Sequence, residues 1–208
     1  MICRRSIKAC SALFLGATVL LAHGRPALAH DPSLGQRAEK AVRREMNLPV
    51  PDFSLTDQDG GPFSFRELRG KVVVVTFVYT SCPDVCPLIT ISLRQVQKEL
   101  RSNERGAVFF LSVTTDPEID SPGVLRSYGQ RYAVDFSNWS FLTGEEKQLA
   151  SVWKAFGVGV ERKARGLVSH TPLTALVDEG GMMRFVYHST QPDPDVILRD
   201  LRTLLSGR

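Results

Sequence analysis

The sequence KVVVVTFVYTSCPDVCP, residues 71–87, joins an apolar β-branched run to two cysteines. Residues 72–78 are too short and too continuously apolar for an amphipathic helix, so they predict a strand that is buried on both faces. Pro87 suits the first position of a helix, where no backbone donor is needed, so we expect a helix from about Cys86. The pattern therefore places Cys82 on a loop and Cys86 at a helix start.

Both cysteines lie where sulfur is reactive or able to bind a metal. A helix N-terminus carries unpaired amides and a partial positive charge, which stabilise a thiolate over a thiol. Three residues separate Cys82 from Cys86, one more than in thioredoxins, and this spacing allows both sulfurs to approach one ion at about 2.3 Å. Two thiolates suit Cu(I), and an added imidazole would suit Cu(II). The spacing alone leaves a metal site and a redox disulfide equally open.

Residues 1–29 have the composition of a secretory signal peptide. Arg4, Arg5 and Lys8 precede the apolar residues 9–22, and Ala27-Leu28-Ala29 fits a cleavage site between small residues. The apolar run is shorter than the roughly 20 residues of a membrane-spanning helix, so we expect an exported, periplasmic protein. A leader that stays uncleaved would instead anchor the protein to the inner membrane.

The remaining chain is long enough for one domain with a buried core. Residues 30–47 have helix-forming composition but a weak apolar stripe, and they predict a solvated helix or a tether. Residues 48–208 are expected to form the functional domain.

Loss of the leader removes the apparent basic character of the chain. The leader holds four of the 26 basic residues and no acidic ones, so 22 acidic residues then face an equal number of basic ones. A neutral chain gives no support for nucleic-acid binding. Cys3 and Cys10 leave with the leader, so Cys82 and Cys86 are the only thiols that reach the oxidising compartment.

Alternating buried strands and helices follow the cysteine motif. Residues 88–101 form a helix with one apolar stripe and residues 107–113 a second buried strand, and such a βαβ unit makes the two strands parallel. Further elements are expected at residues 53–65 (a hairpin), 122–132 (a helix), 139–142 (a strand), 145–156 (a helix capped by Thr143), 161–165 (a charged loop), 173–187 (a second hairpin) and 196–205 (a helix). This order predicts an α/β, thioredoxin-like fold, with a central mixed sheet flanked by helices and an N-terminal β-hairpin extension.

One of the three histidines that follow the leader is placed to meet the cysteines. His170 precedes the strand expected at residues 173–177, which in this architecture lies beside the central strand, so we expect it to be a third metal ligand. His188 is expected at the surface, and His30 is a frayed end unless cleavage after Ala29 lets its amine and imidazole chelate copper. Two thioethers, those of Met182 and Met183, are expected to pack or lie exposed rather than bind metal.

Four segments together resemble the Sco (SenC-like) family of copper-assembly proteins: FVYTSCPDVCP (77–87), TTDPEIDSPGVLRSYGQRY (114–132), WSFLTG (139–144) and SHTPLTALVDEGG (169–181). The resemblance spans roughly residues 48–205. It implies a thioredoxin-like chaperone in which Cys82, Cys86 and His170 bind Cu(I) or Cu(II). The copper would come from a donor chaperone and go to the dinuclear copper site of cytochrome c oxidase subunit II or to another copper-receiving protein. Asp84 matches the family motif and is carried over as a residue that shapes the site.

The same residues leave a second function open. Pro172 stands eight residues before Gly180, the spacing at which thioredoxins place a cis-proline opposite their cysteines, although a trans proline at a strand start is an equally good interpretation. A cis-proline there would suit a thiol-disulfide oxidoreductase, in which Cys82 and Cys86 exchange electrons with a partner's disulfide. Whether the protein is an enzyme is therefore left open by the sequence.

Overall fold

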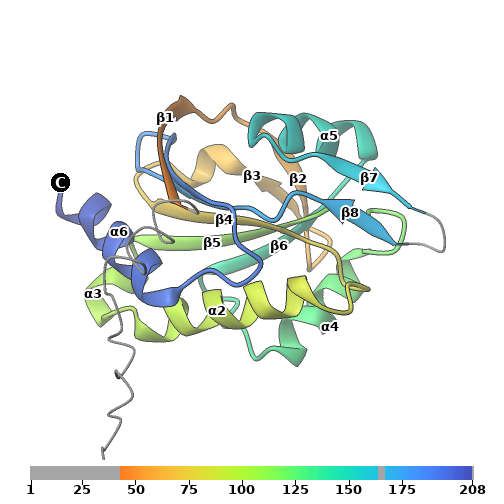
Figure 1. Ribbon diagram of the computed structural model, residues 1–208, viewed down its shortest axis with the longest axis horizontal. Coiled ribbons are helices and arrows are strands. Elements are labelled where there is room, and N and C mark those ends of the chain that lie inside the picture. The colour runs from red at the N-terminus through yellow and green to blue at the C-terminus, as the bar shows by residue number, and fades with distance from the viewer. Residues whose placement is uncertain (1–42, 164–166, 208) are drawn as a thin grey trace, which may run out of the picture.

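The computed structural model describes residues 43–163 and 167–207 of the chain (Figure 1). The elements run in the order β1 (Arg43–Pro49), β2 (Ser54–Asp57), β3 (Pro62–Ser64), a 3₁₀ helix (Phe65–Leu68), β4 (Val72–Val78), α2 (Val85–Glu99), α3 (Ser102–Arg105), β5 (Val108–Thr114), α4 (Pro122–Arg131), β6 (Trp139–Thr143), α5 (Glu146–Ala155), β7 (Val160–Arg162), β8 (Val168–His170), β9 (Thr174–Val177), β10 (Met182–Tyr187) and α6 (Pro194–Ser206). Within this part of the chain, no helix is both long enough and apolar enough to cross a membrane.

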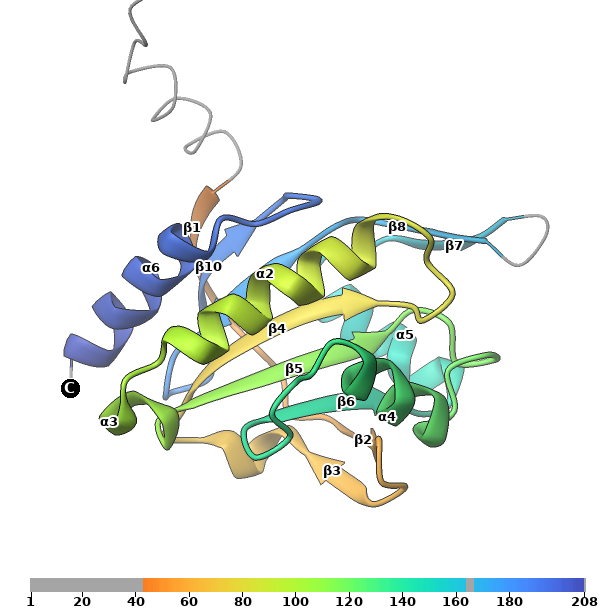
Figure 2. The same cartoon turned by 90° about the horizontal axis from the view of Figure 1, so that it is seen from below.

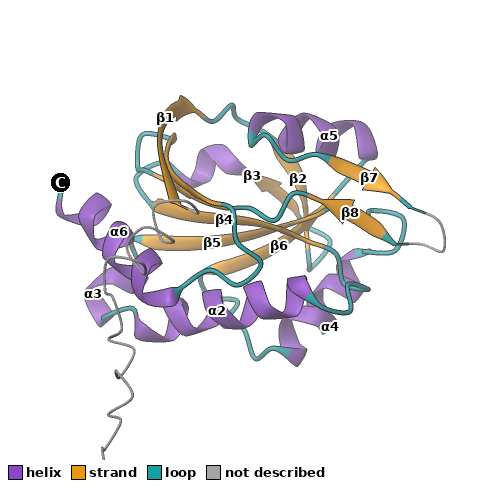
Figure 3. Ribbon diagram, in the orientation of Figure 1, coloured by secondary structure: helices purple, strands orange, loops and turns teal. Residues whose placement is uncertain are grey.

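One mixed sheet of eight strands forms the centre of the molecule, in the order β1-β10-β9-β4-β5-β6-β2-β3. Strands β4, β5 and β6 are parallel, and β9 pairs antiparallel with β4. The helices α2, α4 and α6 lie on one face of the sheet and α5 on the other (Figures 2 and 3). The mixed sheet with flanking helices that the sequence predicts is thus confirmed.

Strand β4 is buried along its whole length, as the apolar run predicts. Val72 and Val74 belong to the core on the α2 face, whereas Val73 and Val75 belong to the core on the α5 face. Helix α2 follows after six residues and begins at Val85, one residue earlier than expected. A proline is tolerated anywhere in the first turn because those amides have no intrahelical partner, so the earlier start is compatible with the sequence.

Both predicted hairpins are confirmed. Strands β2 and β3 pair around residues 58–61, and β9 and β10 pair around residues 178–181. The first hairpin does not stand apart from the sheet, because β2 also pairs antiparallel with β6. It therefore extends the central sheet at one edge.

The expected helix or tether over residues 30–47 is wrong for the residues that the structure describes. Residues 43–47 belong to strand β1, which pairs antiparallel with β10, and residues 30–42 lie outside the described part of the chain. The physical reason is tertiary. Arg43 lies over the ring of Phe185 and pairs with the buried carboxylate of Asp200, so contacts with β10 and α6 override a local helix preference.

Two other local predictions need correction. Thr143 ends β6 and does not cap α5; Glu145 is the N-cap, and its side chain forms a capping box with Gln148. Glu161 and Arg162, expected in a solvated loop, lie in β7, which pairs with β8 in a separate two-stranded sheet. The charge of this segment is used within the fold, since Arg162 pairs with a buried aspartate.

Replacing Asp200 by alanine should lower the free energy of unfolding by about 3 kcal/mol, the cost of leaving a buried partner charge unpaired. Asp200 is 3% exposed, and it accepts hydrogen bonds from Tyr187 Oη at 2.6 Å and from the Arg43 guanidinium. Urea denaturation gives the measurement. The matched control is Glu45→Gln, which removes the exposed partner of the same arginine and should change stability by less than about 1 kcal/mol. Equal effects of the two changes would contradict the role given to Asp200.

Candidate metal centre

The two cysteines lie just beyond the carboxyl end of β4. A turn closed by the bond from Cys82 N–H to the Tyr79 carbonyl, 3.2 Å, carries the chain out of the strand. Cys82 is half-buried on this loop, and Cys86, in the first turn of α2, is fully buried. The backbone N–H of Cys86 points at Cys82 Sγ at 3.4 Å, and both residues are free thiols. The helix start therefore faces the first sulfur, as the sequence predicts.

The environment divides the two thiols into a thiolate and a thiol. A hydrogen bond from the Cys86 thiol, together with the backbone amides of Cys86 and Asp84, lowers the pKa of Cys82 to about 5. The same hydrogen bond, and then burial, raise the pKa of Cys86 far above its ordinary value. At neutral pH Cys82 is thus an accessible thiolate and Cys86 a buried, protonated thiol.

His170, the last residue of β8, completes the group. Its Nε2 lies 3.8 Å from Cys86 Sγ, and its Nδ1 lies 3.1 Å from the Thr171 carbonyl oxygen. Because a carbonyl only accepts, this second contact requires the proton on Nδ1 and leaves the lone pair of Nε2 toward the sulfur. Burial lowers the pKa of His170, so the ring is neutral at neutral pH. The structure therefore brings together all three side chains that the sequence predicts as ligands.

Two of the candidate donors, Cys86 Sγ and His170 Nε2, have a spacing that suits one soft ion. A sulfur and a nitrogen at about 2.3 and 2.1 Å from the same ion, about 120° apart, are separated by about 3.8 Å. Cys86 Sγ and His170 Nε2 lie 3.8 Å apart. Among residues 43–163 and 167–207, there is no group of three His, Cys, Asp or Glu side chains whose arrangement could hold a metal ion. The pair of Cys86 and His170 therefore has the spacing of a shared ion, whereas the set of three has to rearrange to enclose one.

Tyr79 is a residue of the site that the sequence reasoning missed. Its ring meets the His170 ring edge-on, with centroids 5.9 Å apart, and it packs with Cys86 and Val168 in a small apolar cluster. Burial, and then a hydrogen bond to Cys82, raise the pKa of Tyr79, so its hydroxyl donates to the thiolate. The only sequence signal was its position at the end of the buried strand.

The other candidates lie elsewhere or outside the described residues. His188 is exposed beyond β10, as expected, whereas Met183 is 3% exposed in the core and Met182 is half-buried. His30 falls outside the described part of the chain. No cis peptide bond occurs among the described residues, so Pro172 is trans, in agreement with the second of its two interpretations.

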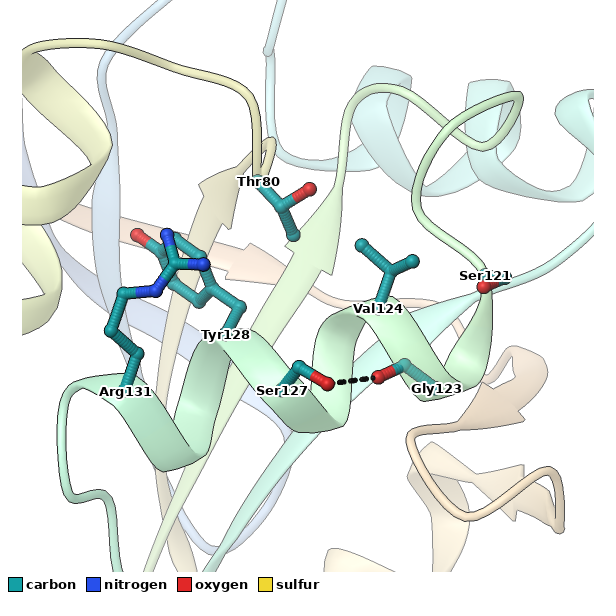
Figure 4. Close-up of a pocket in the computed structure, with 7 residues that line it drawn as sticks. All are labelled: Thr80, Ser121, Gly123, Val124, Ser127, Tyr128 and Arg131. Atoms are coloured by element: carbon teal, nitrogen blue, oxygen red, sulfur yellow. Dashed lines mark hydrogen bonds between the residues drawn. The ribbon is translucent and has the colours of Figure 1, made fainter.

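A groove of about 420 Å³ adjoins the cysteine loop on the side of α4. Figure 4 shows its lining residues, Thr80, Ser121, Gly123, Val124, Ser127, Tyr128 and Arg131. Three of its hydroxyls already have partners: Ser127 Oγ donates to the Gly123 carbonyl, Tyr128 Oη contacts Thr90 Oγ1, and Thr80 Oγ1 bonds Asp120. These three hydroxyls of the groove are thus engaged within the fold and are not added to the candidate ligands Cys82, Cys86 and His170.

Residues 42–206 match the SCO1/SenC family model. The protein belongs to the SCO1/SenC family. This match confirms the resemblance seen in the four sequence segments, and it covers every described element.

Relatives of the protein share both sequence and fold. The SCO1 protein homolog of Bacillus subtilis is 30% identical over 166 residues, which are 78% of this chain and 86% of the homolog. BsSco, a member of the Sco family of cytochrome c oxidase assembly proteins in which a disulfide switch was identified, superposes with a TM-score of 0.68 at 28% identity, covering 81% of this chain and all of BsSco. Bradyrhizobium japonicum ScoI with copper bound gives a TM-score of 0.62 at 26% identity, covering 76% of this chain and 99% of ScoI. These neighbours confirm the thioredoxin-like fold.

Iodoacetamide should modify the reduced, metal-free protein at Cys82 alone. The rate should be half-maximal near pH 5 and should fall as the pH drops through that value, because the thiolate is the reactive form and its pKa lies at about 5. Mass spectrometry of quenched samples measures the rate at each cysteine.

The control for this experiment is Cys86→Ala. It removes the main hydrogen bond to the thiolate and should move the midpoint to higher pH. Equal labelling of both cysteines, or a wild-type midpoint at the ordinary thiol pKa, would contradict the asymmetry of the pair.

Proposed function

We propose that the protein is an exported copper chaperone that holds Cu(I) or Cu(II) through the thiolates of Cys82 and Cys86 and through Nε2 of His170. One observation carries this proposal. Two elements far apart in the sequence, the start of α2 and the end of β8, place a soft sulfur and a neutral imidazole nitrogen 3.8 Å apart, beside a second sulfur that is already ionised. Such a donor set suits copper in either oxidation state.

The family supports copper as the cargo and oxidase assembly as the purpose. ScoI of Bradyrhizobium japonicum is a relative with copper bound, and BsSco is a member of a family of cytochrome c oxidase assembly proteins. We infer that a copper donor chaperone loads this protein and that it delivers the ion to the dinuclear copper site of oxidase subunit II. Residues 1–29 would direct it to the periplasm, free or anchored according to whether the leader is cleaved.

We infer the order of events during loading from the exposure and the protonation of the three donors. Cys82, the half-exposed thiolate, is the first donor that an arriving ion meets. Cys86 must then lose its proton, because only a thiolate binds, so loading releases a proton and weakens as the pH falls. His170 needs no proton loss at Nε2. Release would run in reverse, with a donor of the acceptor protein replacing Cys82 first.

The asymmetry of the two thiols also favours a second candidate function, disulfide reduction. The Cys82 thiolate would attack a partner's disulfide and form a mixed disulfide, with one partner sulfur leaving as a thiolate. Cys86 would pass its proton to that leaving thiolate and attack Cys82 Sγ, which forms the Cys82–Cys86 disulfide and releases the second partner sulfur. Two electrons pass to the partner, whose copper-binding cysteines would then be reduced.

Replacing His170 by alanine should abolish the Cu(II)–thiolate absorption band of the wild-type complex and weaken copper binding at least about tenfold, because the only nitrogen donor is lost. Titration against a competing chelator measures the affinity, and visible absorption measures the band. The control is His188→Ala, which removes an exposed histidine that is not one of the three proposed ligands and should change neither.

The same variants separate the two functions. Unchanged copper binding in His170→Ala would refute the three-ligand site. Reduction of a disulfide substrate that survives His170→Ala and disappears in Cys82→Ala would support the oxidoreductase. If His170→Ala loses copper binding and the wild-type protein has no reductase activity, the chaperone would remain as the sole function.

A further inference from the structure

An acidic turn, residues 116–120, lies between the two halves of the metal centre. It follows β5, and the backbone amides of Ile119 and Asp120 close it by donating to the Asp116 carbonyl at 3.2 and 2.9 Å. Both aspartates are completely buried. A buried carboxylate is costly unless it is paired, so each must have a partner that justifies its place.

Asp120 holds the cysteine loop. Its carboxylate accepts the backbone N–H of Thr80 at 3.2 Å and also the Thr80 hydroxyl, two residues before Cys82. It accepts the hydroxyl of Thr114 as well, and that hydroxyl oxygen in turn accepts the N–H of Asp116 at 2.9 Å. The cysteine half of the site is therefore bonded to the acidic turn.

Asp116 holds the hairpin that carries His170. Its Oδ1 pairs with the Arg162 guanidinium, which also reaches Glu118 Oε2 at 3.3 Å. Its Oδ2 has no hydrogen-bond partner among the described residues, so Arg162 supplies the charge compensation. Arg162 stands opposite Val168 in the β7–β8 pair, and His170 closes that pair opposite Val160.

The hairpin has little else to hold it in place. Strands β7 and β8 have three residues each and form a sheet separate from the central one. Isolated hairpins of this length are marginally stable in water. The other contacts of the hairpin with the rest of the fold are those of Val160 and Val168 with the apolar cluster around Cys86, and the edge-on packing of the His170 ring against Tyr79.

We propose that Asp116 and Arg162 are positioning residues that fix His170 against the cysteines, by bonding the histidine hairpin to the same acidic turn that holds the cysteine loop. The proposal rests on the function proposed above and deepens it. Neither side chain would contact the ion. Both would act by fixing the position of β8, the strand that ends at His170. Asp116 is buried but the Arg162 side chain is 38% exposed, and a partly exposed ion pair contributes little net stability, so a role in geometry explains the pair better than a role in stability.

The test is the double variant Asp116→Asn/Arg162→Gln, which removes both charges together and so does not leave the buried carboxylate of Asp116 unpaired. The thermal midpoint should stay within a few degrees of wild type. Copper affinity should fall about tenfold, the ordinary effect of losing a partner that orients a ligand, and the Cu(II)–thiolate band should shift. Hydrogen exchange of the β7–β8 amides should quicken in the metal-free protein, with the amides of β4 unchanged.

Two comparisons make the test specific. Glu161→Gln/Lys163→Gln removes an ion pair of the same hairpin that does not reach the turn, and it should leave affinity and exchange at wild-type levels. In a His170→Ala background the Asp116→Asn/Arg162→Gln change should cause no further loss of affinity, because the pair acts only through His170.

The outcomes keep the two proposals apart. Wild-type exchange and wild-type affinity in Asp116→Asn/Arg162→Gln would overturn the positioning role. So would a loss of affinity of the same size in the presence and absence of His170. Copper binding that does not depend on His170 at all would overturn the three-ligand site, and the exchange of the hairpin amides would then decide by itself whether the pair positions β8.

Discussion

The burial of β4 on both faces is the constraint on which the rest of the structure depends. All seven of its side chains are buried, between the α2 face and the α5 face of the sheet. A strand enclosed in this way has no side chain to offer for binding, so chemistry begins where the strand ends. The carboxyl ends of β4 and β5 lie next to each other in the parallel pair, and this is where the cysteine loop and the acidic turn emerge.

The surroundings of the site explain how the fold holds a reactive donor set. Cys82 is stabilised as a thiolate by the Cys86 thiol, by backbone amides and by Tyr79, whereas Cys86 keeps its proton inside an apolar cluster. His170 is neutral because it is buried, and its protonated Nδ1 is occupied by a carbonyl. The site thus holds one ionised donor and one neutral nitrogen in advance, and it defers a single deprotonation until the ion arrives.

The sequence was sufficient to predict the central strand, both hairpins and the three side chains that meet at the candidate site. These predictions rest on local patterns: a continuous apolar run, turn residues, and a histidine just before a strand that pairs with β4. The missed features depend on partners distant in sequence. Arg43, in β1, forms an ion pair with Asp200 of α6. Arg162, in β7, forms an ion pair with the buried Asp116. Tyr79 lies within the segment 77–87, but its contact with His170 follows from where β8 comes to lie.

The most direct measurement of the central claim is the copper X-ray absorption spectrum of the reduced protein, recorded after titration to saturation. The proposed site predicts one copper per chain, with two sulfur donors from Cys82 and Cys86 and one imidazole nitrogen from His170. Copper coordinated by sulfur alone, or a saturated protein that holds no more copper than two unassisted thiols would bind, would contradict it.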